Sequence, residues 1–414
     1  MENLENIKAA GDVLIEEISL LKGNIVYDIR TFAANVVIQE DIFSNVLTGY
    51  SVFIDAASMI TQFGINGTEK IRIKYRTPGF RQTIEGTFQI TSIDERFLGE
   101  KEQIYVVHFI SLEGFLDNSV RLNKKYSGRT DRIIRDIFNE NLFIEKELIV
   151  SESHNTSLSF LPAFWSPLKC INWVTNRSYK TTPGILFFEG NKKFYLTSLD
   201  KLITLGKNDI YQNYVYSAAG RSNDDSIEKR YAFIQQLNLI NYFDVLQAQD
   251  YGFYASKLVT HDIALKQYKE FSFDGLEYHR RKEHTDTFPT YPIDIIRNPE
   301  SHIHVRTKQY GLFENNQDPK YEVWAMQRNH IMYEMNNLKI SIKVSGKTDI
   351  EVGSMINISI PKSIAHSDNY DMEASFDPYL SGKYLITNIR HEFAMSKHTM
   401  DLECVKESFS EPIK

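Results

Sequence analysis

Alternating apolar and polar residues predict β-strands near both ends of the chain. Residues 71–75 alternate isoleucine and tyrosine with basic residues and are followed by Thr77 and Pro78. Residues 356–360 alternate isoleucine with asparagine and serine and are followed by Pro361. Because successive side chains of a strand point to opposite faces, each stretch predicts a strand with one buried face.

The same motif follows each of these two strands. Residues 86–97 and residues 382–393 both match the pattern G-x-[FY]-x-I-T-x-I-x-x-x-F. A charged turn and a further strand come next, at residues 104–110 and 399–405. One such match could arise by chance in a long chain, but here the whole order of strand, turn, motif and strand occurs twice. This order predicts a duplicated antiparallel β-module.

Within the motif, the glycines, the aromatic residues and the isoleucines are the positions expected to build the modules. Alternation puts Phe88 and Ile90 on one face of their strand, with Tyr384 and Ile386 as counterparts. These are predictions about architecture and not about a binding site. The full set is Gly86, Phe88, Ile90, Ile93, Gly382, Tyr384, Ile386 and Ile389.

The pattern becomes helical after about residue 116. Thr130 is a candidate N-cap, and Ile133, Ile137 and Phe138 follow it on one helical face. A second helix is predicted to begin with Pro167 at its first position. Two strands follow, so that this region reads as a small α/β domain inserted after the first module. Residues 276–318 hold several histidines and prolines and predict an irregular surface excursion, followed by a helix from about residue 319.

The expected fold class is therefore α+β and mainly β, with two antiparallel β-barrel modules and an inserted α/β domain. The early strands of the second barrel stay open between residues 209–275 and residues 336–345. The expected divisions are a first barrel at 1–116, the α/β domain at 117–205, a mixed β region at 206–335, and a second barrel with a C-terminal tail at 336–414.

Composition narrows the function. The net charge of −7, with both signs interspersed, argues against a dedicated nucleic-acid binder. Cys170 and Cys404 are expected to be small buried residues and not a disulfide framework. The acidic N-terminus lacks the apolar segment of a Sec signal, and no apolar run reaches the roughly 20 residues that span a bilayer. We therefore expect a soluble protein made in a cytoplasm.

No motif carries a specific catalytic signal. Neighbouring carboxylates, Glu16-Glu17 and Asp94-Glu95, would point to opposite faces of a strand, whereas a glycosidase needs two that converge. His261-Asp262 has no nucleophile at a recognisable elbow. The sequence also lacks the Walker A and G-x-G-x-x-G patterns. We therefore predict no catalytic and no cofactor-binding residue.

Two groups of polar residues have both a functional and an ordinary interpretation. His302 and His304 lie on one side of a predicted strand, near His279 and His284 in sequence, and zinc uses such residues when three or four converge. Solvated histidines on a polar loop are the preferred interpretation, so we predict no metal. A basic cluster could meet an acidic partner, but a solvated helix face is preferred. Its members are Lys124, Lys125, Arg129, Arg132 and Arg135.

Six blocks carry a family resemblance: residues 128–137, 167–174, 252–256, 261–263, 352–361 and 382–393. Their order resembles the central baseplate hub protein of contractile-tailed bacteriophages, which is related to the hub part of type VI secretion spike proteins. The resemblance covers residues from about 10 to 408. In that family the two β-modules are tail-tube-like barrels, and three copies present six barrels as a pseudo-sixfold ring.

The resemblance implies a structural protein of the virion tail baseplate, assembled in the host bacterial cytoplasm. The expected partners are two further copies in a homotrimer, the tail tube protein and a central spike protein, with the tape measure and baseplate wedge proteins as further candidates. DNA would pass through an acidic lumen without specific binding. Unlike the type VI proteins, this chain ends soon after the second module, so a spike would be a separate chain.

Two alternatives remain beside the hub. Another assembly protein related to the tail tube, such as a distal tail or tube-initiating protein, would share the β-modules. A cell-wall-degrading enzyme with β-sandwich domains belongs to a different class, and it would need two converging carboxylates in a cleft.

Overall fold

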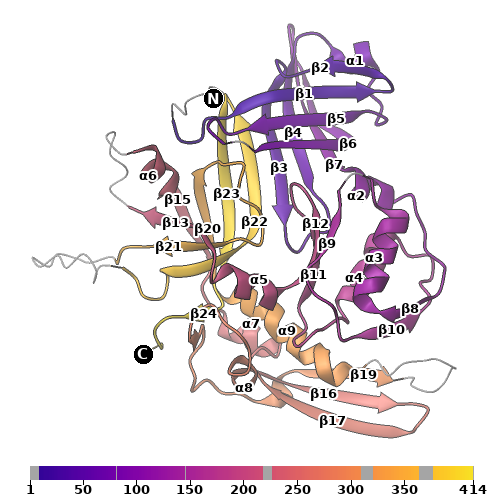
Figure 1. Cartoon of the computed structure of the whole chain (residues 1–414), viewed down its shortest axis with the longest axis vertical. Coiled ribbons are helices and arrows are strands. Elements are labelled where there is room, and N and C mark those ends of the chain that lie inside the picture. Colours follow the sequence, from indigo (N-terminus) through magenta and orange to yellow (C-terminus); the bar gives the residue numbers. More distant parts are fainter. Residues whose placement is uncertain are drawn as a thin grey trace, which may run out of the picture.

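The computed structural model describes residues 9–80, 82–144, 146–217, 226–308, 320–362 and 376–413. Strands are the commonest regular structure among these residues, and Figure 1 shows two β-rich parts beside a smaller part that contains α3 and α4. The predicted α+β, mainly β fold class is confirmed. Residues 309–318 of the predicted excursion and the start of the helix predicted after it lie outside the described residues.

The first module is a curled antiparallel sheet. Its strands follow the spatial order β3-β4-β7-β6-β5-β1-β2. Ile71 and Ile73 of β5 and Phe88 and Ile90 of β6 are buried in its core, as the alternation predicts. The elements are β1 (Leu14–Lys22), β2 (Ile25–Asp28), β3 (Ala33–Asp41), β4 (Thr48–Asp55), α1 (Met59–Phe63), β5 (Lys70–Arg76), β6 (Thr83–Leu98), β7 (Gln103–Ser111) and α2 (Leu112–Asp117).

The second module draws strands from both of the regions that the sequence left open. β13 lies beside β21, and β15 lies beside β20. Tyr384, Ile386 and Ile389 of β22 are buried in its core. The elements are β13 (Ile210–Tyr216), α6 (Ile227–Ala232), β14 (Phe233–Ile234), β15 (Gln236–Asn241), β20 (Lys339–Ser345), β21 (Met355–Ser359), β22 (Gly382–Ala394) and β23 (Lys397–Val405).

The two modules form one continuous sheet of 14 strands and not two separate barrels. β22 is long enough that its first half pairs with β21 while its second half pairs with β3 of the first module. Figure 1 shows β22 and β3 side by side, although they come from opposite ends of the sequence. No closed barrel is found among the described strands.

The α/β insertion packs two helices against a three-stranded sheet. Pro167 is the first residue of α4, and the Ser166 side chain caps that helix as expected of an N-cap. The prediction for Thr130 was wrong by one position: Arg129 is the N-cap of α3, and the Thr130 hydroxyl instead bonds His154 Nδ1. The elements are β8 (Tyr126–Arg129), α3 (Thr130–Asn141), β9 (Leu148–Val150), β10 (Ser157–Phe160), α4 (Pro167–Thr175), β11 (Ile185–Glu189), β12 (Phe194–Ser198) and α5 (Leu199–Gly206).

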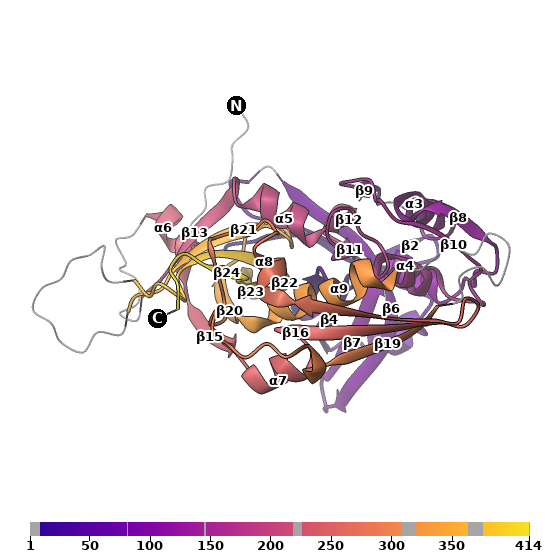
Figure 2. The same ribbon diagram turned by 90° about the horizontal axis from the view of Figure 1, so that it is seen from below.

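The remaining residues form a lower part around one long helix. Figure 2 shows α9 alongside β16, which is the middle strand of a small sheet with β17 and β19. Two short strands, β18 and β24, join this part to the end of the chain. The elements are α7 (Val245–Asp250), β16 (Ala255–Asp262), β17 (Gln267–Asp274), α8 (Gly275–His279), β18 (Phe288–Pro289), η1 (Pro299–Ser301), β19 (Ile303–Lys308), α9 (Tyr321–Asn337) and β24 (Ser408–Phe409).

The strand register confirms the internal duplication over the first part of the two motif copies. Gly86 lies opposite Ile73 in the first module, and Gly382 lies opposite Ile358 in the second. One residue further along the same face, Phe88 lies opposite Ile71, and Tyr384 lies opposite Ile356. The two copies of the motif therefore occupy the same place in the two modules.

The shared threonine of the motif is the extra residue of a β-bulge in both modules. The register shifts between Ile90 and Ser92 in β6, and between Ile386 and Asn388 in β22. The Thr91 hydroxyl donates to the His108 carbonyl at 3.2 Å, and the Thr387 hydroxyl donates to the Glu403 carbonyl at 3.2 Å. A bulge bends its strand and increases the local twist, so both long strands turn at the same point.

The final phenylalanines of the two motif copies are not equivalent. β6 contains an additional residue between Asp94 and Phe97, which shifts the rest of the strand by one position. Leu98 therefore faces Gln103 in the place where Phe393 faces His398 in the second module. The sequence match hides this shift because both strands carry an aromatic residue nearby.

We expect Thr387→Val to lower the free energy of unfolding by about 1–2 kcal/mol, because Thr387 is buried and the Glu403 carbonyl would lose this donor. Thr91→Val should cost less than about 0.5 kcal/mol, because Thr91 is exposed and water can replace its hydroxyl. Thermal unfolding of the two variants beside the unsubstituted protein tests this difference. Equal losses of unfolding free energy in the two variants would contradict the conclusion that the buried Thr387 hydroxyl contributes more than the exposed Thr91 hydroxyl.

Candidate assembly interface

The junction between the modules is an antiparallel pairing of β22 with β3. Seven residue pairs run from Asn388 opposite Asp41 to Ala394 opposite Asn35. On the inner face, Phe393 of the second module enters the core of the first module, where its ring lies 4.3 Å from that of Tyr75. Backbone pairing and the insertion of Phe393 into the core of the first module thus hold the two modules together.

Three buried polar side chains also cross the junction. The Nε2 atom of His391 lies 2.8 Å from the Glu40 Oε1 atom, and its Nδ1 atom lies 3.0 Å from the Nε2 atom of His398. The carboxylate can only accept, so His391 donates to Glu40 through Nε2, and a second hydrogen bond joins its Nδ1 atom to the Nε2 atom of His398. Burial, together with the neighbouring His391, holds the pKa of His398 well below its usual range. His398 is therefore neutral in the folded protein.

The outer face of the junction carries an ionic network. Arg390 lies 3.0 Å from Asp401 and 3.1 Å from Glu392, and its other terminal nitrogen donates to the Tyr50 hydroxyl of the first module at 3.0 Å. Asn35 donates to Glu392 at 3.1 Å. These polar contacts between the modules therefore lie on the solvent side of the buried triad of Glu40, His391 and His398.

Each strand of the junction has an equivalent in the other module. β15 pairs with β20 as β3 pairs with β4, and β20 pairs with β23 as β4 pairs with β7. β6 likewise takes the place of β22, as its register with β5 and β7 shows. The internal junction therefore uses the β22 edge of one module and the β3 edge of the other. The equivalent edges, on β6 of the first module and β15 of the second, take no part in this junction.

These two remaining edges have no strand partner among the residues that the structure describes. β6 pairs with β5 only as far as Gln89, so one side of its second half is open. β15 pairs with β20 alone. An open edge presents unpaired N–H and C=O groups, which makes it a template for another strand.

Apolar side chains on the open edges are exposed where their equivalents in the junction are buried. Leu98 is 76% exposed, whereas its equivalent Phe393 is 2% exposed. Leu239 of β15 is 48% exposed, whereas its equivalent Ile38 of β3 is 2% exposed. Phe97 and Ile240 are also exposed on these edges. Unpaired strands with exposed apolar side chains beside them make these two edges candidate protein–protein interfaces.

Three of the four carboxylates that form neighbouring pairs in the sequence, Glu16, Glu17 and Asp94, have partners in the structure. Glu16 lies 2.8 Å from Arg76, and Glu17 lies 3.8 Å from Arg72, so both form ion pairs between β1 and β5. Asp94 lies 3.4 Å from His108 on the neighbouring strand. These contacts give the carboxylates a role in sheet pairing.

The other polar candidates are also placed by the fold. Asp262 accepts a hydrogen bond from the Leu265 backbone in the turn after β16, whereas His261 is exposed. In the basic cluster, Arg129 pairs with Asp131 at 2.5 Å and Lys124 pairs with Glu140. The remaining members of the cluster, Lys125, Arg132 and Arg135, are exposed to solvent.

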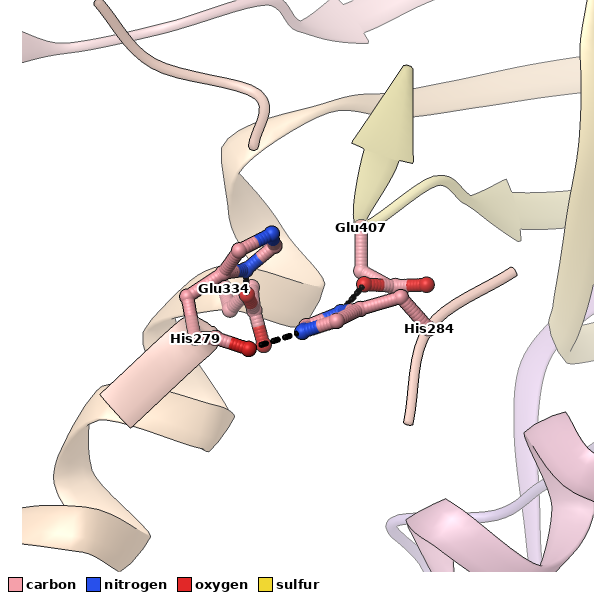
Figure 3. A group of neighbouring side chains, drawn as sticks. All are labelled: His279, His284, Glu334 and Glu407. Carbon is pink, nitrogen blue, oxygen red and sulfur yellow. Dashed lines mark hydrogen bonds and ion pairs between the residues drawn. The ribbon is translucent and has the colours of Figure 1, made fainter. Parts of the chain in front are cut away.

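The four histidines that the sequence offered as possible zinc ligands divide into two pairs. The rings of His302 and His304 meet edge to face with centroids 4.4 Å apart, and burial lowers the pKa of His304 to about 4. His279 and His284 lie instead in a group with Glu334 and Glu407, shown in Figure 3. Sequence reasoning missed the two glutamates because they lie 50 residues or more along the chain from these histidines.

The described part of the chain contains no helix that is both long enough and apolar enough to cross a membrane. Cys170 and Cys404 are both buried and free, as the sequence predicts.

The fold matches that of phage tail proteins. The tail protein from Neisseria meningitidis MC58 superposes over 94% of this chain and 96% of its own, with 10% identity and a TM-score of 0.54. The 43 kDa tail protein of prophage MuSo2 from Shewanella oneidensis covers 94% and 98%, with 9% identity and a TM-score of 0.55. The E. coli c3393 protein, a component of the type VI secretion system, covers 97% and 78%, with 9% identity and a TM-score of 0.44.

Comparisons with models of protein families and with curated proteins found no match. The first two structural likenesses, at such low identity, show the fold that this chain shares with phage tail proteins.

Acid should weaken the junction through His398. Its folded-state pKa lies below the ordinary value of 6.5, so the unfolded chain takes up a proton first as the pH falls, and stability is lost below that value. Between pH 6.5 and 5 this residue would account for up to about 2 kcal/mol of lost unfolding free energy. The variant His398→Gln should show a correspondingly shallower loss in urea unfolding across this range.

The matched control is His261→Gln, which replaces an exposed histidine. This variant should leave the pH dependence of the unfolding free energy unchanged. A His398→Gln variant that loses stability with acid as steeply as the unsubstituted protein would contradict this role for the triad.

Proposed function

We propose that the protein is a structural hub of a phage tail baseplate, built as a homotrimeric ring. The two unused strand edges carry the proposal, because they repeat the two edges that already join the modules within one chain. The ring would join a sixfold tail tube to a threefold central spike and would line the channel for DNA. The shared fold with phage tail proteins supports a role in the tail.

The two leftover edges favour a closed ring over a two-fold dimer. Each chain offers one β6 edge and one β15 edge, and these are different surfaces. Contacts between different surfaces are head-to-tail, and they close into a ring when the rotation between copies is suitable. Three chains would place six similar β-modules around the ring, which is the number that a sixfold tube requires.

The internal junction also predicts the register between copies. By equivalence with Glu392 opposite Val37, Phe97 of one copy lies opposite Asn238 of the next. By equivalence with Phe393 opposite Val36, Leu98 lies opposite Leu237. Leu98 would then take the role that Phe393 has within the chain and enter the core of a neighbouring module.

A structural role also accounts for the chemistry of the surface. The predicted carboxylate and histidine candidates form ion pairs, turns and sheet contacts. We infer that the protein is not an enzyme and works through its interfaces with tube, spike and its own copies. Each copy has a net charge of −7, so a trimer would be strongly acidic and would let DNA phosphates slide past.

The double variant Phe97→Cys with Asn238→Cys tests the ring. Directly opposed residues of antiparallel strands have Cα atoms about 4.5–5.5 Å apart, which suits a disulfide. Mild oxidation should therefore link neighbouring copies, and a non-reducing gel should show bands up to the trimer and none above it. Both native cysteines are buried, so they should not contribute to these bands.

The matched control is Leu98→Cys with Asn238→Cys. Moving one residue along the strand turns the side chain to the other face of the sheet, so this pair should link poorly. Light scattering of the unsubstituted protein should give three times 48.1 kDa. Equal linking of both pairs, or ladders beyond the trimer, would overturn the proposed register and ring.

A further inference from the structure

A group of four side chains in the lower part has the composition of a metal site. His279 ends α8, His284 follows in the next loop, Glu334 lies on α9, and Glu407 lies directly before β24 (Figure 3). One potential ligand atom from each residue lies within 4.8 Å of all the others. His279, Glu334 and Glu407 are buried, and His284 is nearly so.

We propose that these four residues bind one divalent transition-metal ion, for which zinc is the natural probe. Two imidazoles with two carboxylates give four nitrogen and oxygen ligands, a number that suits tetrahedral zinc. Tetrahedral zinc with bonds of about 2.0–2.2 Å holds its ligand atoms about 3.3–3.6 Å apart, so atoms that are now up to 4.8 Å apart would have to move closer together on binding. The two carboxylates offset most of the positive charge in such a site, which would comprise the dication and the neighbouring Lys282.

The atoms that do not face the centre already have partners. The second oxygen of Glu334 accepts from Lys282 at 2.6 Å. The second oxygen of Glu407 accepts from the Thr285 backbone at 2.6 Å and from its hydroxyl at 2.8 Å. His284 donates from Nε2 to the His279 carbonyl at 2.6 Å. Such outer contacts orient the ligands of a metal and raise their affinity.

Two further observations point to a ligand. The Nε2 atom of His279 is buried and has no hydrogen-bond partner among the described residues. A pocket of about 540 Å³, lined in part by His279, Lys282 and His284, opens beside the group and offers a route for an ion. A buried donor set with its outer atoms held in place and an entry path has the features expected of a metal site.

Without a metal, the same residues form a charge-balanced network. His284 faces a carboxylate through Nδ1, at 2.5 Å from Glu407, and a carbonyl through Nε2. Both partners accept, so both nitrogens carry protons, and the imidazolium and Lys282 balance Glu334 and Glu407. Metal binding at Nδ1 would release this proton, so zinc affinity should fall with acid.

A metal bound at this site would link the segment around β24 to the helices of the lower part. Glu407 directly precedes β24, which pairs with β18, while Glu334 lies on the helix that packs against β16. A metal bridging these elements would stabilise the folded chain against unfolding. This role is independent of the proposed ring.

The test is zinc binding by the full-length protein after its metal has been removed with a chelator. Calorimetric titration with Zn²⁺ alone should show one site per chain, and saturation should raise the melting temperature. Glu407→Gln keeps the size of the side chain but removes its charge, and it should weaken zinc binding at least a hundredfold. His284→Asn provides a second variant if the first does not fold.

The matched control is the double variant His302→Gln with His304→Gln. It removes the other histidine pair of the lower part and should leave zinc affinity and stoichiometry unchanged. The proposal is overturned if the unsubstituted protein shows no one-to-one zinc binding. It is also overturned if the control loses that binding, or if both ligand variants fold and keep it.

Discussion

The structure depends on how the long β22 strand satisfies its backbone hydrogen bonds. Its first half belongs to the second module, where β21 and β23 lie on either side. Beyond the bulge at Thr387, β21 no longer pairs with it, and β3 of the first module takes that side. Because unpaired backbone groups in a buried strand are costly, the two modules cannot separate without exposing this edge. One strand thereby makes two similar modules into a single sheet.

The buried polar triad helps to specify this pairing. A one-residue slip of β22 against β3 would move His391 away from Glu40 and place Phe393 on the wrong face. Glu40 would then lose its bonded partner in a buried environment, which is unfavourable. The apolar and polar contacts of the junction thus favour the same register, which is a sign of a well-specified interface.

The local parts of the fold could be predicted from the sequence, whereas the long-range pairings could not. Alternation located the strands, and the repeated motif predicted the duplication, because both are local properties of the chain. No local pattern indicates that residues 388–394 pair with residues 35–41, since a strand's alternation defines a face and not a partner. For the same reason the sequence did not indicate Glu334 and Glu407 as neighbours of His279 and His284. They come close to these histidines only because the packing of α9 and β24 in the fold brings them there.

Fusing two modules in one chain changes the energetics of ring formation. In the proposed ring, half of the junctions would be those that form within each chain, at a high effective concentration, where a large residue such as Phe393 is buried without help from another copy. The other half would form between copies, so in this proposal their edges have to remain soluble before assembly. Charged neighbours such as Glu95 and Arg96 lie beside the exposed Phe97 and Leu98, and they hinder unspecific strand pairing. The difference between the two kinds of edge is therefore what a chain needs if it folds alone first and assembles later.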